Sequence, residues 1–301
     1  MKDVMPVETF PLMNITPMFL NGSDSKRSPE PRAASVRGQL RYWLRAVEGA
    51  QGRSLDEVWK RESTFLGSTA GGSRVSVRFY SADGPPQVSA WEMLPHRNEK
   101  KSPQPALDPD QQFVLEIVSR PGAPIPTRLK HVTLIWLMLG GLGKRSRRMF
   151  GALNIGWRTE DSLFASPEEY AQQLKTGLNG LIKDPVPMPN VPSFPTLHPE
   201  HSRIVVGTKG EKEWQPLMVS FFRDLLRTGQ YRQSENSFGQ ATGGRRASPV
   251  IAQVRKIGDR YYPVITAMRS RPDRNIDWNI VGKFMQDVEK RWNGITAWGT
   301  L

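Results

Sequence analysis

The sequence contains no cysteine, which excludes disulfide bonds, thiolate metal ligands and thiol nucleophiles. Long apolar runs are missing as well. The longest one, TLIWLMLGGLG, falls well short of the roughly 18 to 20 residues that span a bilayer. The N-terminus does not have the layout of a signal peptide. We therefore predict a cytoplasmic protein that does not enter a membrane.

Histidine is also scarce, and the four histidines are scattered as His96, His131, His198 and His201. HPEH has two histidines at a spacing that suits a metal, but the surrounding prolines leave no helix to aim both rings. We predict no metal site and no cofactor. Asp24, in the polar segment 21–32, is a candidate general acid or base. The alternative interpretation of Asp24 is an exposed loop carboxylate.

What the chain has in excess is positive charge. It contains 42 lysines and arginines against 29 aspartates and glutamates, a formal net charge of +13. Such an excess indicates a polyanionic partner, and we favour nucleic acid over an anionic membrane surface. A hydrophobic content of 38% is sufficient for a packed core. The length predicts two domains of about 150 residues each.

Prolines divide the chain near residue 190, where DPVPMPNVPSFPTLHPE breaks helices and central strands. On each side of this break the hydrophobic patterns predict the order βαββαβ. We therefore predict an α+β fold of two tandem ferredoxin-like domains of the RNA-recognition type. The first domain is expected over 1–160 and the second over 201–301. Between them, 161–200 holds an extra helix, with Ser166 and Glu169 as a capping box, and the proline-rich linker.

The predicted elements follow from these patterns. In the first half we expect strands over 7–18, 73–81, 112–119 and 151–157, and helices over 34–48 and 128–142. In the second half we expect strands over 202–207, 248–257, 261–270 and 294–300, and helices over 214–229 and 278–292.

The segment RAASVRGQLRYWLRAVE is predicted to form an amphipathic helix that begins near residue 34, with Ser35 as its cap. At about 100° per residue, one face of this helix carries a row of three arginines. A separate sector carries an apolar stripe for the core, composed of Val36, Leu40, Trp43, Leu44 and Val47. The arginine row, Arg37, Arg41 and Arg45, is either a solvated face or an anion-binding surface.

GGLGKRSRRMFGAL, residues 140–153, is the most informative candidate site. Its glycines allow a tight turn whose N–H groups point at an anion, and Phe150 offers a ring for base stacking. The cations of this loop are Lys144, Arg145, Arg147 and Arg148. It is neither a Walker A loop nor a dinucleotide fingerprint, because the spacing and the preceding helix do not match. The alternatives are a flexible basic turn and, for Phe150, a core position.

In the second half, SFGQATGGRRASPV places Arg245 and Arg246 in a glycine-rich loop that enters a strand. Contact with phosphate and a solvated turn are both compatible with this pattern.

Five stretches carry a family resemblance: ITPMFLNG, RAASVRGQLRYWLRAVEG, FLGSTAGGSRVSVR, GLGKRSRRMFG and GGRRASPVIAQV. The sequence resembles the RAMP proteins of type III CRISPR systems, and most closely the first RAMP subunit of the type III-B (Cmr) effector complex. By matching motif positions, the resemblance implies that RNA is bound by Arg32, Ser35, Arg37, Gly38, Arg41 and Arg45, and by Gly141, Gly143, Lys144, Arg145, Arg147, Arg148 and Phe150. Met149 departs from the glycine expected at its position.

The resemblance implies a non-catalytic RNA-binding subunit that contacts the 3′ part of the guide RNA and the incoming target RNA, beside other RAMP subunits, in antiviral defence. We expect the arginine row to face a cleft shared with the 140–151 loop, so that both bind one backbone. Two alternatives remain. One is a RAMP-type metal-independent endoribonuclease that processes guides or cuts targets, and the other is a basic scaffold for protein partners.

Overall fold

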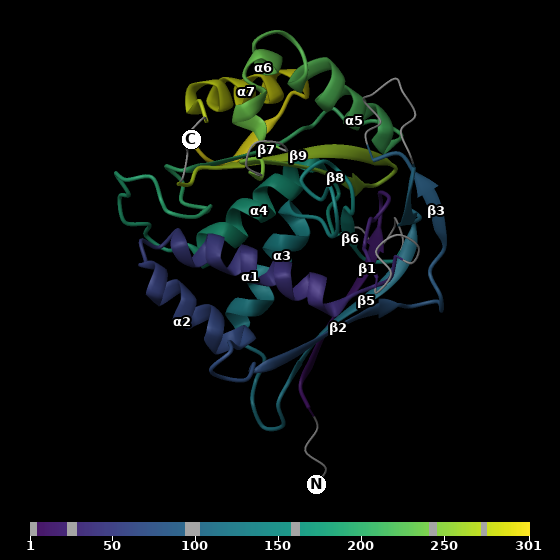
Figure 1. Ribbon diagram of the computed structural model, residues 1–301, viewed down its shortest axis with the longest axis vertical. Helices are drawn as coiled ribbons and strands as arrows, with labels where there is room; N and C mark the ends of the chain where they lie inside the picture. The colour runs from purple at the N-terminus through teal and green to yellow at the C-terminus, as the bar shows by residue number, and fades with distance from the viewer. Residues whose placement is uncertain (1–4, 23–28, 94–102, 158–162, 241–245, 272–275) are drawn as a thin grey trace.

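The computed structural model describes residues 5–22, 29–93, 103–157, 163–240, 246–271 and 276–301. Asp24 and Arg245 therefore lie outside the described residues. Among the described residues, no helix is long and apolar enough to cross a membrane. Figure 1 shows most of the first half of the chain below the second half, with α1 and α2 on the left and the strands of the first sheet on the right.

The first half forms a four-stranded antiparallel sheet with the strand order β2-β5-β1-β6. These strands span Val75–Ser81, Gln111–Ser119, Val7–Asn14 and Leu153–Ile155. Along the chain, α1 (Ala33–Gly49) lies between β1 and β2, and α3 (Thr127–Leu139) lies between β5 and β6.

The second half repeats this arrangement in an antiparallel sheet with the order β10-β7-β9-β8. Its strands span Ile295–Gly299, Ser202–Val206, Arg260–Met268 and Val250–Ile257. In each half, the last strand of the sheet lies beside the first strand, on the side away from the other two. The predicted α+β class is therefore confirmed, and both sheets are antiparallel.

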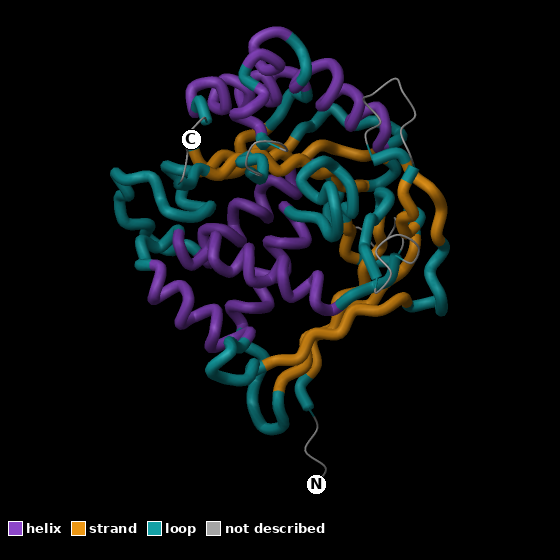
Figure 2. Tube along the Cα trace, in the orientation of Figure 1, coloured by secondary structure: helices purple, strands orange, loops and turns teal. Residues whose placement is uncertain are grey.

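The second sheet lies between two layers of helices, as Figures 1 and 2 show. One face contacts α3 and α4 (Pro167–Leu181), and the other contacts α5 (Trp214–Phe221) and α7 (Trp278–Arg291). Side chains alternate between the faces along a strand. In β7, Ile204 therefore packs in one core and Val205 in the other, under α5 and α7. Both cores contain residues of both halves, since Leu44 packs in the core of Ile204 and Phe150 in the core of Val205.

The apolar stripe predicted for α1 is buried. Leu40 and Leu44 are 0% exposed and Trp43 is 1% exposed, and all three pack in the core that contains Ile204. α3 is apolar around most of its circumference because α1, α4 and strands of both sheets surround it. The contacts of α3 with β8 and β9 join the first half to the second sheet.

Three elements were not predicted from the sequence. α2 (Leu55–Leu66) begins at a capping box in which the Ser54 hydroxyl accepts from the backbone N–H of Glu57 at 3.3 Å. β3 (Val88–Trp91) pairs with β4 (Gln104–Leu107) in a separate two-stranded sheet. The prolines of that stretch favour irregular structure, but a strand at an edge tolerates proline.

The ends of two helices also differ from prediction. α1 starts at Ala33 with Arg32 as its N-cap, so Ser35 lies within the first turn and the prediction of a Ser35 cap is wrong. The helix predicted over 214–229 is divided into α5, a π-helical turn (Phe222–Leu226) and α6 (Gly229–Gln233), which a 3-10 turn (Glu235–Phe238) follows. The predicted Ser166 cap of α4 is confirmed, since its hydroxyl accepts from Glu169 N at 3.2 Å.

A buried carboxylate ties several elements of the first half together. Glu48, near the C-terminal end of α1, is 0% exposed. It forms ion pairs with Arg53 at 2.6 Å, with Arg61 at 3.5 Å and with Arg128 of α3. One buried carboxylate thus binds three arginines, so part of the cationic excess of the sequence stabilises the fold.

Replacing Leu40 by Ala is expected to lower the free energy of unfolding by about 2 to 5 kcal/mol, because the fully buried side chain leaves a cavity. Gly38→Ala is the matched control on the same helix. A Cβ at Gly38 would meet nothing within 4 Å, so this exchange is expected to stabilise α1 by up to about 1 kcal/mol. Chemical denaturation followed by circular dichroism measures both variants. Equal losses would contradict the division of faces on α1.

Candidate nucleic-acid interface

The glycine-rich loop between α3 and β6 is fastened to a strand of the second half. The backbone N–H of Met149 donates to Ala252 O of β8 at 2.9 Å, and Ala252 N donates to Arg147 O at 3.2 Å. Farther back in the loop, Lys144 N donates to Phe19 O at 2.9 Å. Backbone hydrogen bonds to both halves therefore fix the course of this loop.

Two glycines permit this course because their backbone lies in the left-handed region. Gly143 has φ +91°, and Gly151 has φ +61°. A Cβ at Gly151 would lie 1.8 Å from Leu142 O, so a side chain there is excluded. Met149 also has positive φ, +65°, although its side chain is buried in the core. The glycine expected at position 149 would relieve this strain, and the buried Met149 side chain contributes packing in its place.

The loop forms one side of an open depression of about 370 Å³. Residues of the second half form the other side, including Arg246, which the sequence had marked as a separate candidate. The lining consists of Arg145, Ser146, Arg147, Arg148, Gly239, Gln240, Arg246 and Ser248, and none of these is acidic. The structure thus brings two predicted basic sites together. Arg245, the neighbour of Arg246, is outside the described residues.

Two of the loop arginines are held in place by the second half. Arg147 donates to Ser248 O at 2.7 Å, and its guanidinium carbon lies 5.0 Å from the ring centroid of Tyr42 in α1. Arg148 donates to Phe238 O at 2.7 Å. These contacts orient both guanidiniums along the wall of the depression.

The electrostatics of the depression favour an anion. Burial lowers the pKa of Arg148 to about 10, and the charges of Arg145, Arg147 and Arg227 act in the same direction. Burial also lowers the pKa of Arg246. Neighbouring cations destabilise the charged form of each other, so a bound phosphate would relieve the repulsion.

Phe150 does not offer its ring to solvent. It is 2% exposed and packs edge-on against Phe19, with ring centroids 5.1 Å apart, and against Trp214 at 6.1 Å. The interpretation of Phe150 as an exposed stacking platform is corrected to its alternative, a core position. The sequence could not distinguish an exposed stacking ring from a core position, because an aromatic residue at the end of a loop is compatible with both.

The arginine row of α1 faces α2 rather than an open cleft. Arg37 donates to Leu66 O at 2.6 Å, and Arg41 donates to the same oxygen at 2.8 Å and to Gly67 O at 2.7 Å. These carbonyls belong to the last turn of α2 and its C-cap, where backbone acceptors need partners. Arg41 and Arg45 also both form ion pairs with Glu62. The expected cleft shared with the 140–151 loop is therefore a wrong prediction.

Glu62 is a buried acid on α2, 3% exposed. Burial would raise the pKa of Glu62, but the hydrogen bonds and charges of Arg45 and Arg41 outweigh it and lower the pKa. The sequence gave no sign of this pairing because α2 was not predicted. Tyr42 and Trp43 occupy the part of α1 nearest the glycine-rich loop, since Arg147 lies over Tyr42 and a Cβ at Gly140 would meet Trp43 Nε1 at 2.8 Å.

Three further residues of the α1 motif, Arg32, Ser35 and Gly38, have no contacts with other described residues that point to an RNA-binding site. Arg32 donates to Asn21 O at 3.0 Å and lies 3.9 Å from Glu30 in an exposed pair. Ser35 donates its backbone N–H to Arg32 O. Gly38 has open space around it. RNA contact by these three residues stays a prediction.

Sequence reasoning missed two buried polar residues of β8 that support the loop. Gln253 is 0% exposed and its Nε2 donates to Ser146 O. Arg255 is 2% exposed and donates to Gly140 O, at the C-terminus of α3, at 2.7 Å. Burial lowers the pKa of Arg255. The available signal was Gln253 and Arg255, which stand among apolar residues of the strand VIAQVRKI; Lys256 is its third polar residue.

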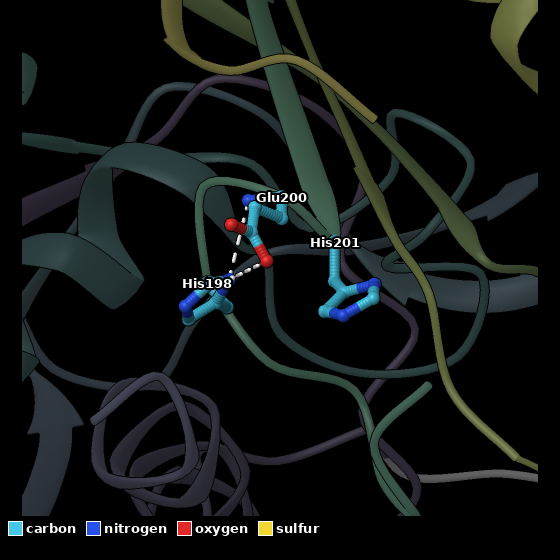
Figure 3. A group of neighbouring side chains, drawn as sticks. All are labelled: His198, Glu200 and His201. Atoms are coloured by element: carbon cyan, nitrogen blue, oxygen red, sulfur yellow. Dashed lines mark hydrogen bonds and ion pairs between the residues drawn. The ribbon is translucent and has the colours of Figure 1, made fainter. Parts of the chain in front are cut away.

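His198, Glu200 and His201 come together where the proline-rich segment meets β7, with candidate ligand atoms within 4.8 Å of one another (Figure 3). His198 Nε2 lies 3.0 Å from Val186 O, and His201 Nε2 lies 2.7 Å from Met188 O. A carbonyl only accepts, so both Nε2 atoms carry the proton. Through these hydrogen bonds the two rings fasten the proline-rich segment.

We expect Arg41→Ala to lower the free energy of unfolding by about 2 kcal/mol, because it removes charged hydrogen bonds to α2. Lys144→Ala, an exposed cation on the loop, is the control and is expected to change stability by less than about 0.5 kcal/mol. Urea denaturation measures both. In filter binding with single-stranded RNA, Arg41→Ala should stay within about twofold of wild type. A stable Arg41→Ala variant with strongly weakened binding would restore the original interpretation.

The sequence matches known proteins over most of its length. The model of the RAMP superfamily matches residues 12–154. CRISPR system Cmr subunit Cmr1-1 of Pyrococcus furiosus is 25% identical over an alignment 340 residues long, gaps included. The alignment covers 98% of this chain and 99% of the relative. Cmr subunit Cmr1-2 of the same organism is 30% identical over an alignment 178 residues long, gaps included. This alignment covers 48% of this chain and 93% of the relative.

Solved structures agree in fold. The crystal structure of Cmr1 from Pyrococcus furiosus in its apo form has a TM-score of 0.68 at 21% identity, and the match covers 99% of this chain and 100% of that one. A chain of the cryo-EM structure of the Type III-B Cmr-beta bound to cognate target RNA has a TM-score of 0.63 at 9% identity, covering 88% and 94%. The 30% identity to Cmr1-2, over 93% of that relative, establishes that the chain belongs to the family of Cmr1 subunits, within the RAMP superfamily.

Proposed function

We propose that the chain is a non-catalytic RNA-binding subunit of a type III-B CRISPR effector complex. In this role it contacts the 3′ part of the guide RNA and the incoming target RNA, beside other RAMP subunits. One observation carries the proposal: four arginines from two distant segments line one open depression, and none of the described residues in its wall is acidic. The names of its relatives, which are Cmr subunits, support the assignment.

The depression suits a nucleic-acid backbone better than base edges. Guanidinium groups bind phosphate oxygens through paired, charge-assisted hydrogen bonds. Such contacts fix the position of a strand and do not read its sequence. Binding of this kind fits a subunit of a complex in which pairing between guide and target supplies the specificity.

We further propose that the two halves are tandem ferredoxin-like domains, over 1–160 and 201–301, joined by 161–200. The equal strand order of the two sheets supports this division. Buried contacts between the halves support a fixed arrangement, since Ile204 and Leu44 belong to the same cluster of buried residues. The depression at their junction would then be a rigid surface.

The main alternative is a RAMP-type metal-independent endoribonuclease. Such an enzyme needs a proton donor and a proton acceptor near the 2′-OH of the RNA. Within the described part of the chain, the depression is lined by neither histidine nor carboxylate. Asp24, the remaining candidate, lies outside the described residues.

The proposal predicts how binding depends on salt. If Lys144 and Arg145 each neutralise one phosphate of a single strand, replacing both by Gln flattens the slope of log K against log salt by about 1.4. Lys60→Gln with Lys175→Gln removes the same charge from α2 and α4 and should leave the slope nearly unchanged. Titrations at several salt concentrations measure this, and an unchanged slope in the loop variant would exclude the loop from the RNA interface.

A second prediction addresses catalysis. Asp24→Ala is expected to leave target cleavage by the assembled complex unchanged, because this subunit only binds RNA. Cleavage products of labelled target RNA, resolved on a denaturing gel, report the result. If one product disappears, the chain is an enzyme and the non-catalytic assignment is wrong.

A further inference from the structure

A second, narrower cavity of about 80 Å³ lies next to the basic depression, and the two share Arg145 and Arg148 in their walls. Its other lining residues are mostly apolar and include Met93, Phe150 and Met218. Phe150 therefore contributes to a cavity wall although its ring is almost fully buried. The cavity combines cations on one side with an apolar interior.

One wall of this cavity is the π-helical turn Phe222–Leu226, which continues α5. Turns of π-helix are rare and often occur at functional sites. The first and last residues of the turn, Phe222 and Leu226, both line the cavity. The irregular backbone and the cavity thus coincide.

Arg148 lies between the two cavities and carries an unused hydrogen-bond donor. Its Nη2 donates to Phe238 O, and its guanidinium carbon lies 5.4 Å from the ring centroid of Phe222. Its Nη1 is buried and has no hydrogen-bond partner. A buried donor without an acceptor is destabilising, so an acceptor supplied by a ligand would be favourable here.

We propose that this cavity takes one unstacked nucleobase, of pyrimidine size, from the strand whose backbone lies in the adjacent depression. The inference rests on the proposed RNA-binding function and extends it. The base ring contacts the apolar walls beside Leu226, and a carbonyl oxygen of the base accepts from Arg148. The phosphate of the same nucleotide reaches Arg145, which lines both cavities.

The size of the cavity determines which base it accepts. An enclosed cavity of about 150 Å³ holds a benzene ring. A cavity of about 80 Å³ encloses only part of such a ring, and the remainder of the base stays in the opening beside the depression. A pyrimidine is favoured over a purine, because the fused rings of a purine leave a larger part of the base outside the cavity.

The test compares single-stranded RNA with and without bases. Wild type is expected to bind an eight-nucleotide oligouridylate about tenfold more tightly than an abasic oligomer of the same length and charge. Leu226→Trp fills the cavity, so this preference should fall to about twofold, while the affinity for the abasic oligomer stays the same. Fluorescence anisotropy measures all four affinities.

Gln215→Trp, on the exposed side of α5, is the matched control and should keep the tenfold preference. Met93→Trp blocks the cavity from a loop and replaces Leu226→Trp if a melting curve shows that the latter does not fold. An unchanged preference in a folded, blocked variant would overturn the base pocket alone. An oligoadenylate with the same dependence on Leu226 would overturn the pyrimidine assignment. If wild type binds neither the oligouridylate nor the abasic oligomer, the proposed function is overturned together with the pocket.

Discussion

The attachment of the glycine-rich loop to β8 is the interaction on which the candidate interface depends. Hydrogen bonds between Met149, Ala252 and Arg147 make the loop an irregular continuation of the second sheet. The loop belongs to the first half by sequence, so this attachment also joins the two halves. Without it, the cations of the loop and Arg246 would have no fixed relation to each other, and the depression would not exist as a single surface.

The arginines of this chain fall into two groups that composition cannot separate. One group stabilises the fold: Arg41 and Arg45 pair with Glu62, while three others surround Glu48. The second group lines the depression, and no described residue of its wall is acidic. The proposed anion-binding surface consists of this second group, because acceptors inside the protein already bind the first.

Local signals in the sequence predicted much of the fold. Alternating and helical periodicities predicted the βαββαβ order of elements along each half, and the apolar stripe around Leu40 was correctly assigned to the core. What failed depended on partners distant in the sequence. The arginine row was interpreted as free because α2 was not predicted. Phe150 was interpreted as exposed because the residues that cover it, Phe19 and Trp214, lie far from it in the sequence. The meeting of the glycine-rich loop with Arg246 likewise follows from tertiary packing, which no local pattern encodes.

The central claim is that RNA lies in the depression between the glycine-rich loop and the loop before β8. Photo-crosslinking with RNA that contains 4-thiouridine, followed by mass spectrometry of the crosslinked peptides, tests it most directly. The account predicts crosslinks within 140–151 and 239–248, and also at the π-helical turn if a base enters the narrow cavity. Crosslinks confined to α1 and α2 would contradict the account, because they would place the RNA on the face where the arginine row pairs with Glu62.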